Sequence, residues 1–120
     1  MKKIQIKFTN YQDEKFNYNY IIDVCFTATS QDLTLLHVNA KWNESNDYDL
    51  RGIKHAKIIM ARLEDQKASL KQSIRSVPTV VLLDKNGRPL GQWAAGLNFK
   101  LILEKEVIQN RINQVLFENK

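Results

Sequence analysis

The chain has little cysteine: Cys25 is its one thiol among 120 residues. A single thiol forms no internal disulfide, so no disulfide framework holds this protein together. Together with His37 and His55, it also lacks the spacing of a four-ligand zinc site. The sequence therefore predicts no metal, no cofactor, and a fold that depends on an apolar core.

Long apolar runs are also missing, and none approaches the ~18–20 residues that a membrane-spanning helix needs. The start of the chain, Met1 to Lys3, is positively charged. However, Ile4, Ile6 and Phe8 then alternate with polar residues, whereas a signal peptide has a continuous apolar region. These absences predict an untargeted, cytoplasmic protein that does not enter a membrane.

Positive charge is in modest excess, with 18 Lys and Arg against 13 Asp and Glu and a formal net charge of +5. The basic residues are dispersed along the chain, which is typical of a solvated surface. Nucleic acid is therefore disfavoured as a partner, although a basic nucleic-acid-associated domain stays an alternative. The length and the 43% hydrophobic content fit one domain over residues 1–120.

Apolar runs and alternating patterns predict five strands. They cover residues 4–8, 33–40, 57–63, 79–83 and 89–95. Asn86-Gly87 predicts a hairpin with a type I′ turn, in which both residues have positive φ. Pro89 lacks an N–H, which favours a sheet edge for the last strand. Residues 9–19 are polar enough to be a loop, and residues 20–28 fit either a helix or a strand.

Helical patterns predict three helices. They cover residues 48–55, residues 66–73 with Asp65 as the cap, and a final helix from Asn98 to Phe117. In the final helix Leu101, Ile108 and Val115 recur at helical spacing, so one face should pack on the sheet.

An ordered set of motifs then stands out. Ala40-Lys41-Trp42 ends one predicted strand, Val77-Pro78-Thr79 begins another, and the Asn86-Gly87 hairpin follows. In this order the motifs resemble the thioredoxin family over residues 33–116. The resemblance implies an α/β fold, with a central mixed sheet flanked by helices and a shortened second helix. It also implies three mutually parallel strands over residues 4–8, 33–40 and 57–63, a cis peptide bond before Pro78, and Trp42 close to that bond.

The chain departs from the family at the redox motif. Where redox-active members carry two cysteines after the tryptophan, it has Asn43 and Asn46. Thiol exchange needs a thiolate and a second, resolving thiol, and an amide supplies neither. Either asparagine is instead a good helix N-cap. His37 stands where the family has a buried acid, and we expect a neutral, hydrogen-bonded core histidine there.

These observations favour a non-catalytic domain that binds a protein partner, as an adaptor or a subunit of a larger assembly. A thiol-dependent oxidoreductase using Cys25 stays an alternative, although burial of Cys25 as a small apolar residue is favoured. Trp93 is expected to pack inside the fold, and the acidic residues around Asp47 to form a solvated loop and not a cation site. The candidate partner-binding residues are Trp42, Asn43, Glu44, Ser45, Asn46, Ser76, Val77, Pro78, Thr79 and Gly96.

Overall fold

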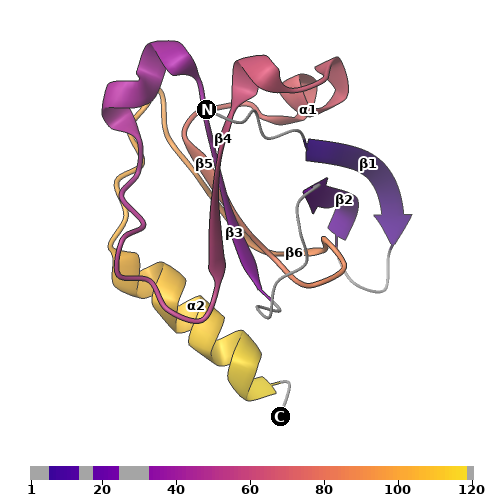
Figure 1. Ribbon diagram of the computed structural model, residues 1–120, viewed down its shortest axis with the longest axis vertical. Helices are drawn as coiled ribbons and strands as arrows, with labels where there is room; N and C mark the ends of the chain where they lie inside the picture. The colour runs from indigo at the N-terminus through magenta and orange to yellow at the C-terminus, as the bar shows by residue number, and fades with distance from the viewer. Residues whose placement is uncertain (1–5, 14–17, 25–32, 119–120) are drawn as a thin grey trace.

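The computed structural model describes residues 6–13, 18–24 and 33–118. Its central element is a four-stranded mixed sheet of order β4-β3-β5-β6 (Figure 1). β3 and β4 are parallel, while β5 runs antiparallel to both β3 and β6. Helices accompany the sheet on both faces, so the protein has the α/β fold that the sequence predicted. The strands of the sheet are β3 (Thr34–Asn39), β4 (Lys57–Arg62), β5 (Thr79–Leu83) and β6 (Pro89–Ala94).

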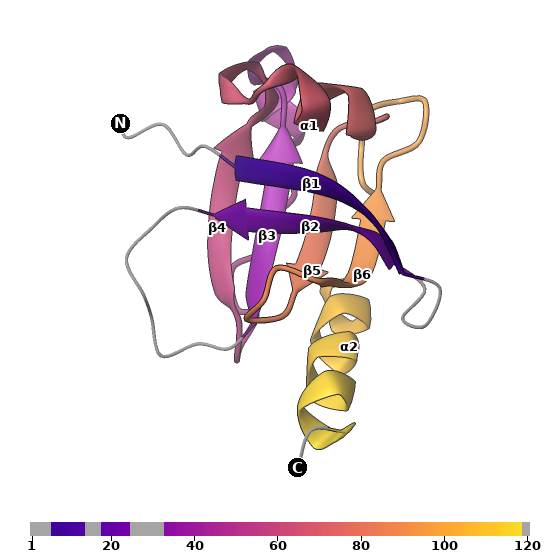
Figure 2. The same cartoon turned by 90° about the vertical axis from the view of Figure 1, so that its right-hand side faces the viewer.

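The N-terminal segment forms a separate hairpin. β1 (Ile6–Asp13) pairs antiparallel with β2 (Tyr18–Val24), and the pair crosses one face of the four-stranded sheet (Figure 2). The prediction that the first strand joins the sheet in parallel is therefore wrong. The loop predicted over residues 9–19 is also wrong, because Thr9 to Asp13 lie in β1, and Tyr18 and Asn19 lie in β2. A local antiparallel partner closes a short loop, which costs less chain entropy than a distant parallel one.

Two of the three predicted helices are present, but each begins later than predicted. α1 (Ala68–Ser73) follows the short 3₁₀ helix η2 (Leu63–Asp65), and its N-cap is Lys67, not Asp65. α2 (Lys105–Glu118) begins well after Asn98, whose side chain accepts a hydrogen bond from Lys100 N–H in a turn. In both places the predicted cap belongs to a local turn instead.

Residues 48–55, predicted as a helix, contain none. The segment includes Gly52 with a φ of 91° and His55 with a φ of 74°, both in the left-handed region that a right-handed helix excludes. The connection from β3 to β4 therefore has only one short 3₁₀ helix, η1 (Lys41–Asn46). An irregular segment over residues 47–56, with a turn at Arg51 and Gly52, completes this connection.

The hairpin between β5 and β6 is present, but its turn is not type I′. Gly87 has a positive φ of 82°, whereas Asn86 does not. The Asp84 carboxylate accepts hydrogen bonds from the N–H groups of Asn86 (2.8 Å) and Arg88 (2.9 Å). The aspartate side chain therefore satisfies the backbone N–H groups of the turn. The chain reverses with only one residue, Gly87, in the left-handed region.

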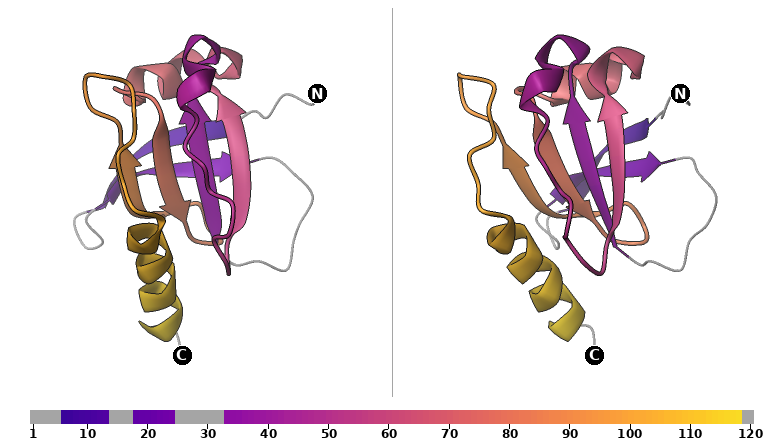
Figure 3. Two further views of the ribbon diagram at one scale, coloured as in Figure 1. Left: turned by 90° about the vertical axis from the view of Figure 1, so that its left-hand side faces the viewer. Right: turned by 60° about the vertical axis from the view of Figure 1, so that its left-hand side comes forward.

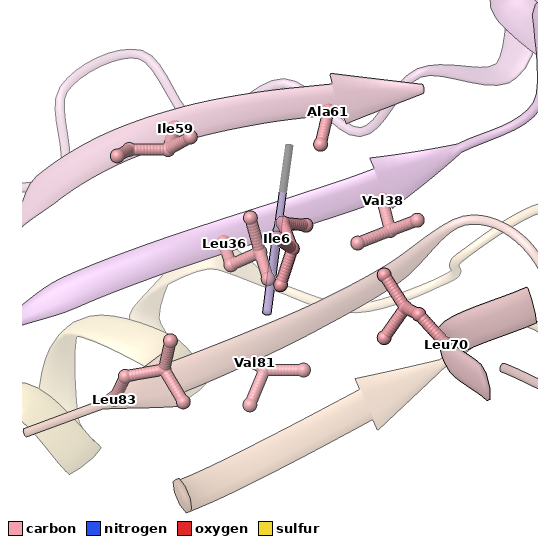
Figure 4. Packing of buried hydrophobic residues seen from close by; sticks show 8 residues of the cluster. All are labelled: Ile6, Leu36, Val38, Ile59, Ala61, Leu70, Val81 and Leu83. Carbon is pink, nitrogen blue, oxygen red and sulfur yellow. The ribbon is translucent and has the colours of Figure 1, made fainter. Parts of the chain in front are cut away.

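The sheet buries a different cluster on each face. On one face, Leu36 and Val38 of β3 meet Leu70 of α1 and Ile6 of β1 (Figure 4). On the other face, Leu35 of β3 packs with side chains of α2, which lies in front of the sheet in Figure 3. Strand alternation explains the division, because successive side chains point to opposite faces. Trp93 of β6 packs against the second cluster, as expected.

Leu82→Ala tests this core. Leu82 is fully buried, so its truncation should lower the free energy of unfolding by about 2–5 kcal/mol. Leu97→Ala is the matched control: Leu97 is fully exposed, and its truncation should change stability by less than about 0.5 kcal/mol. Urea denaturation of both variants measures the difference, and equal losses would contradict the assigned core.

Candidate functional site

Three segments meet at one end of the four-stranded sheet, where β3 and β6 finish and β5 starts. η1 follows the end of β3, the Val77-Pro78 bond precedes β5, and the loop over residues 95–104 follows β6. Because β5 is antiparallel to its two neighbours, the start of β5 lies beside the ends of β3 and β6. The Val77-Pro78 peptide bond is cis, as the resemblance implied, and Ala95 N–H donates to the Pro78 carbonyl at 3.0 Å.

Asn43 joins these three segments through one side chain. Its Nδ2 donates to Phe99 O at 3.0 Å, to Asn39 Oδ1 at 3.0 Å and, more weakly, to Val77 O at 3.4 Å. Its Oδ1 accepts a hydrogen bond from Asn46 Nδ2 at 2.8 Å. Asn43 is 3% exposed, so these bonds form away from water, where a missing partner is costly.

The orientation of the Asn43 amide follows from its neighbours. Two backbone carbonyls face one side of the group, and a carbonyl accepts but never donates. The NH₂ must therefore point toward Val77 and Phe99, with the oxygen toward Asn46. The N-cap role predicted for Asn43 or Asn46 is wrong, since the N-cap of η1 is Ala40 and both asparagines lie within η1.

Apolar side chains project from the same end of the sheet. Trp42 is 66% exposed, Phe99 is 42% exposed and Leu97 is fully exposed. The rings of Trp42 and Phe99 meet edge to face with centroids 5.1 Å apart, a favourable aromatic geometry. We call Trp42 and Phe99 the aromatic surface.

Phe99 has an unusual backbone. Its φ is 59°, in the left-handed region that bulky residues rarely adopt. Three contacts hold it: Phe99 N–H donates to Gly96 O at 3.1 Å, Phe99 O accepts from Asn43, and the ring meets Trp42. Such conformations persist where the surroundings over-determine them, and they cluster at functional sites.

The predicted partner-binding residues fall into two groups. Four of them are buried and support this end of the sheet from inside: Asn43, Val77, Pro78 and Thr79. The remaining ones are at least partly accessible: Trp42, Glu44, Ser45, Asn46, Ser76 and Gly96. The structure thus brings the set together but leaves only part of it at the surface.

Sequence reasoning missed Leu97 and Phe99. Phe99 lies in the segment that was assigned to the final helix, and Leu97 lies between that segment and the preceding predicted strand, so neither carried a separate signal. The positive φ of Phe99 and its contact with Trp42 are tertiary features, because the partner side chains come from η1.

A polar layer lies beneath the aromatic surface. Asn39 Nδ2 donates to Asn43 O at 2.9 Å and to Asp47 Oδ1 at 2.7 Å. The Arg62 guanidinium donates two hydrogen bonds, of 2.8 and 2.9 Å, to the Asp47 carboxylate. These hydrogen bonds, first among them the one from Arg62, hold the Asp47 pKa below its usual range. Asp47 is therefore part of the scaffold and not of the solvated loop predicted there.

His37 lies fully buried in the same layer. Its Nε2 accepts a hydrogen bond from Tyr48 N–H at 3.0 Å, so the proton of the neutral ring is on Nδ1. Burial lowers the His37 pKa below its ordinary value of 6.5, and the positive charge of Arg62 acts in the same direction, while Asp47 partly opposes both. This matches the expected neutral core histidine.

The described residues contain neither a cluster of metal ligands nor a membrane-spanning helix. Over residues 6–13, 18–24 and 33–118, no group of three or more His, Cys, Asp or Glu side chains is arranged to hold a metal ion. No helix in these ranges is long and apolar enough to cross a membrane. Cys25 lies outside the described residues.

Comparisons with known proteins add little. No family model matches this chain, and no curated protein sequence matches it significantly. Among solved structures, the crystal structure of a designed protein is similar with a TM-score of 0.46 and 18% identity. The match covers 72% of this chain and 83% of that one, and at this TM-score it carries no argument about fold or function.

Asn43→Asp tests the amide junction. The substitution keeps the shape but replaces the donor with an acceptor that faces two carbonyl oxygens, so stability should fall by about 2–4 kcal/mol at neutral pH. Asn98→Asp is the matched control, because Asn98 acts as an acceptor toward Lys100 and the aspartate keeps that role. Chemical denaturation of both proteins measures the effect, and equal stability would contradict the assignment.

The buried histidine predicts a pH dependence. The unfolded chain takes up a proton at His37 near pH 6.5 and the folded chain does not, so the free energy of unfolding should decrease as pH falls below 6.5, by at most about 1.4 kcal/mol per pH unit. The stability from Asp47 is lost in a separate window, below its ordinary pKa of 3.8. Denaturation between pH 7 and 5 should show a smaller slope for His37→Gln than for the parent protein. An unchanged slope in His37→Gln would contradict the prediction.

Proposed function

We propose that this chain is a thioredoxin-like domain that binds a protein partner without thiol chemistry, as an adaptor or a subunit of a larger assembly. The strand order β4-β3-β5-β6, the cis bond before β5 and the nearness of η1 to Val77 support this proposal. They match the arrangement implied by the motifs around Trp42 and Pro78. The N-terminal hairpin and the 3₁₀ helix in place of a long second helix are departures from that family.

The observation that carries the proposal is the rigid presentation of exposed aromatic rings. Trp42 and Phe99 are exposed, yet their backbones are tied together through the buried Asn43 amide. Tryptophan anchors many protein interfaces, and a pre-ordered anchor loses less conformational freedom on binding. Phe99 has a φ of 59° and belongs to neither core cluster. Its backbone conformation is better explained by holding the ring at the surface for a partner than by a contribution to folding stability.

The alternatives receive less support from the described residues. The amide of Asn43 is buried and fully engaged, and it offers neither a nucleophile nor a proton carrier. For a nucleic-acid interface, Arg51 and Arg62 would be natural phosphate contacts, but each is already paired with an aspartate. The proposal that Cys25 acts as a lone thiol rests on a residue outside the described ranges.

Peptide selection tests the proposed function. Extended peptides chosen from a random library against the whole protein should bind wild type, and Trp42→Ala should weaken them by at least about tenfold, since a central tryptophan is worth about 2 kcal/mol or more. Phe117→Ala, which truncates another exposed aromatic residue, on α2, should leave the affinity unchanged. Calorimetric titration measures both affinities.

Failure to select any peptide would contradict the proposal. So would a selected peptide that binds Trp42→Ala as tightly as wild type. Trp42 supports no core packing, so its truncation should leave the denaturation midpoint close to that of wild type, which separates lost binding from lost folding.

A further inference from the structure

The two edges of the four-stranded sheet differ in protection. β6 begins at Pro89, and its pairing with β5 shifts register beside Leu83. Proline and register irregularities are devices that prevent further strands from adding to an edge. β4 has neither, since its pairing with β3 is uninterrupted from Lys57 to Arg62. In the part of the chain that the structure describes, no strand lies on the outer side of β4 (Figure 3).

The backbone of β4 has a short open stretch. Lys57 N–H points inward and donates to Leu33 O at 2.9 Å. Because backbone groups alternate in direction along a strand, those of Ile58, Met60 and Arg62 point outward. Arg62 O already accepts a hydrogen bond from Gln66 Nε2 at 3.0 Å. Among the residues that the structure describes, none bonds the outward N–H and C=O groups of Ile58 and Met60, which therefore form the open stretch.

The side chains of this stretch are apolar and accessible. Ile58 is 36% exposed and Met60 is 45% exposed. Both point to the face of the sheet that carries α2, whereas Ile59 points to the opposite core. Beside them lies a hollow of about 420 Å³, lined in part by Tyr48 and Leu50. An unprotected edge with apolar side chains is a site for strand addition.

We propose that β4 pairs antiparallel with β4 of a second copy of this chain, around a twofold axis at Ile59. In this register both backbone groups of Ile58 bond those of Met60 in the second copy, and the symmetry repeats the pair. The exposed side chains of Ile58 and Met60 then cover each other across the interface, as cross-strand apolar pairs do. Two four-stranded sheets become one continuous sheet, with the aromatic surface left free.

Charge and hydrogen bonding select this register. Lys57 lies opposite Ala61 of the second copy, so no like charges face each other across the axis. A shift of two residues in one direction would bring Arg62, whose carbonyl is occupied, opposite Ile58. A shift in the other direction would put Met60 opposite Ala56, beyond the end of the strand. The charges and open hydrogen-bonding groups of β4 are therefore complementary to β4 of a second copy.

Sedimentation velocity over a concentration series tests the proposal, which is independent of the proposed function. Wild type should show a concentration-dependent dimer. Ile58→Lys with Met60→Lys places lysines opposite each other in both pairs and should raise the dimer dissociation constant at least about tenfold. Ile58→Lys with Met60→Glu places opposite charges together and should restore the dimer at low salt. Val107→Lys, at an equally exposed apolar position on α2, is the control and should dimerise like wild type.

Each outcome decides the proposal. A wild type that is monomeric at every concentration overturns it, as does a double-lysine variant that associates like wild type. If the lysine–glutamate variant is weakened as much as the double-lysine variant, the register is wrong. Thermal denaturation checks that each variant folds, and the single variant Met60→Lys carries the same test if a double variant does not.

Discussion

The end of the sheet that carries η1 depends on the hydrogen bonds of the Asn43 amide. One NH₂ group reaches Asn39 of β3, the cis-proline loop at Val77 and the turn at Phe99, which are far apart in the sequence. Because Asn43 is buried, loss of its NH₂ group would deprive the Val77 and Phe99 carbonyls of this donor, at a cost in stability. The position of Trp42, one residue before Asn43, follows from this junction.

The junction belongs to a larger polar layer on a sheet that is otherwise apolar. β3 supplies Leu35 to one core, while His37 and Asn39 on the same face carry hydrogen bonds to Tyr48 and Asn43. Buried polar groups of this kind fix one arrangement of their surroundings, because their bonds are directional. Packing by apolar residues alone would leave the residues 47–56 free to settle in several ways.

Much of the fold was predictable, since apolar runs bounded by turn residues specify the strands locally. The strand over residues 79–83 and the sheet edge at Pro89 followed from such patterns. The antiparallel partner of β1 did not, because residues 20–28 fit a helix and a strand equally. The start of α2 was also missed, since apolar spacing continues through a loop whose turn is fixed by the Asn98 side chain. The site was predicted in outline from Trp42 and Pro78.

The sequence by itself determined that a thiol site is absent here, because Asn43 and Asn46 carry no sulfur in any conformation. It also determined the four strands of the central sheet, through local apolar patterns. Only the tertiary structure decided that Asn43 is buried as a junction and that Phe99 joins Trp42 at the surface. The physical reason is that the hydrogen bonds and ring contact link η1 to loops more than thirty residues away, and spacing along the chain does not encode such pairs.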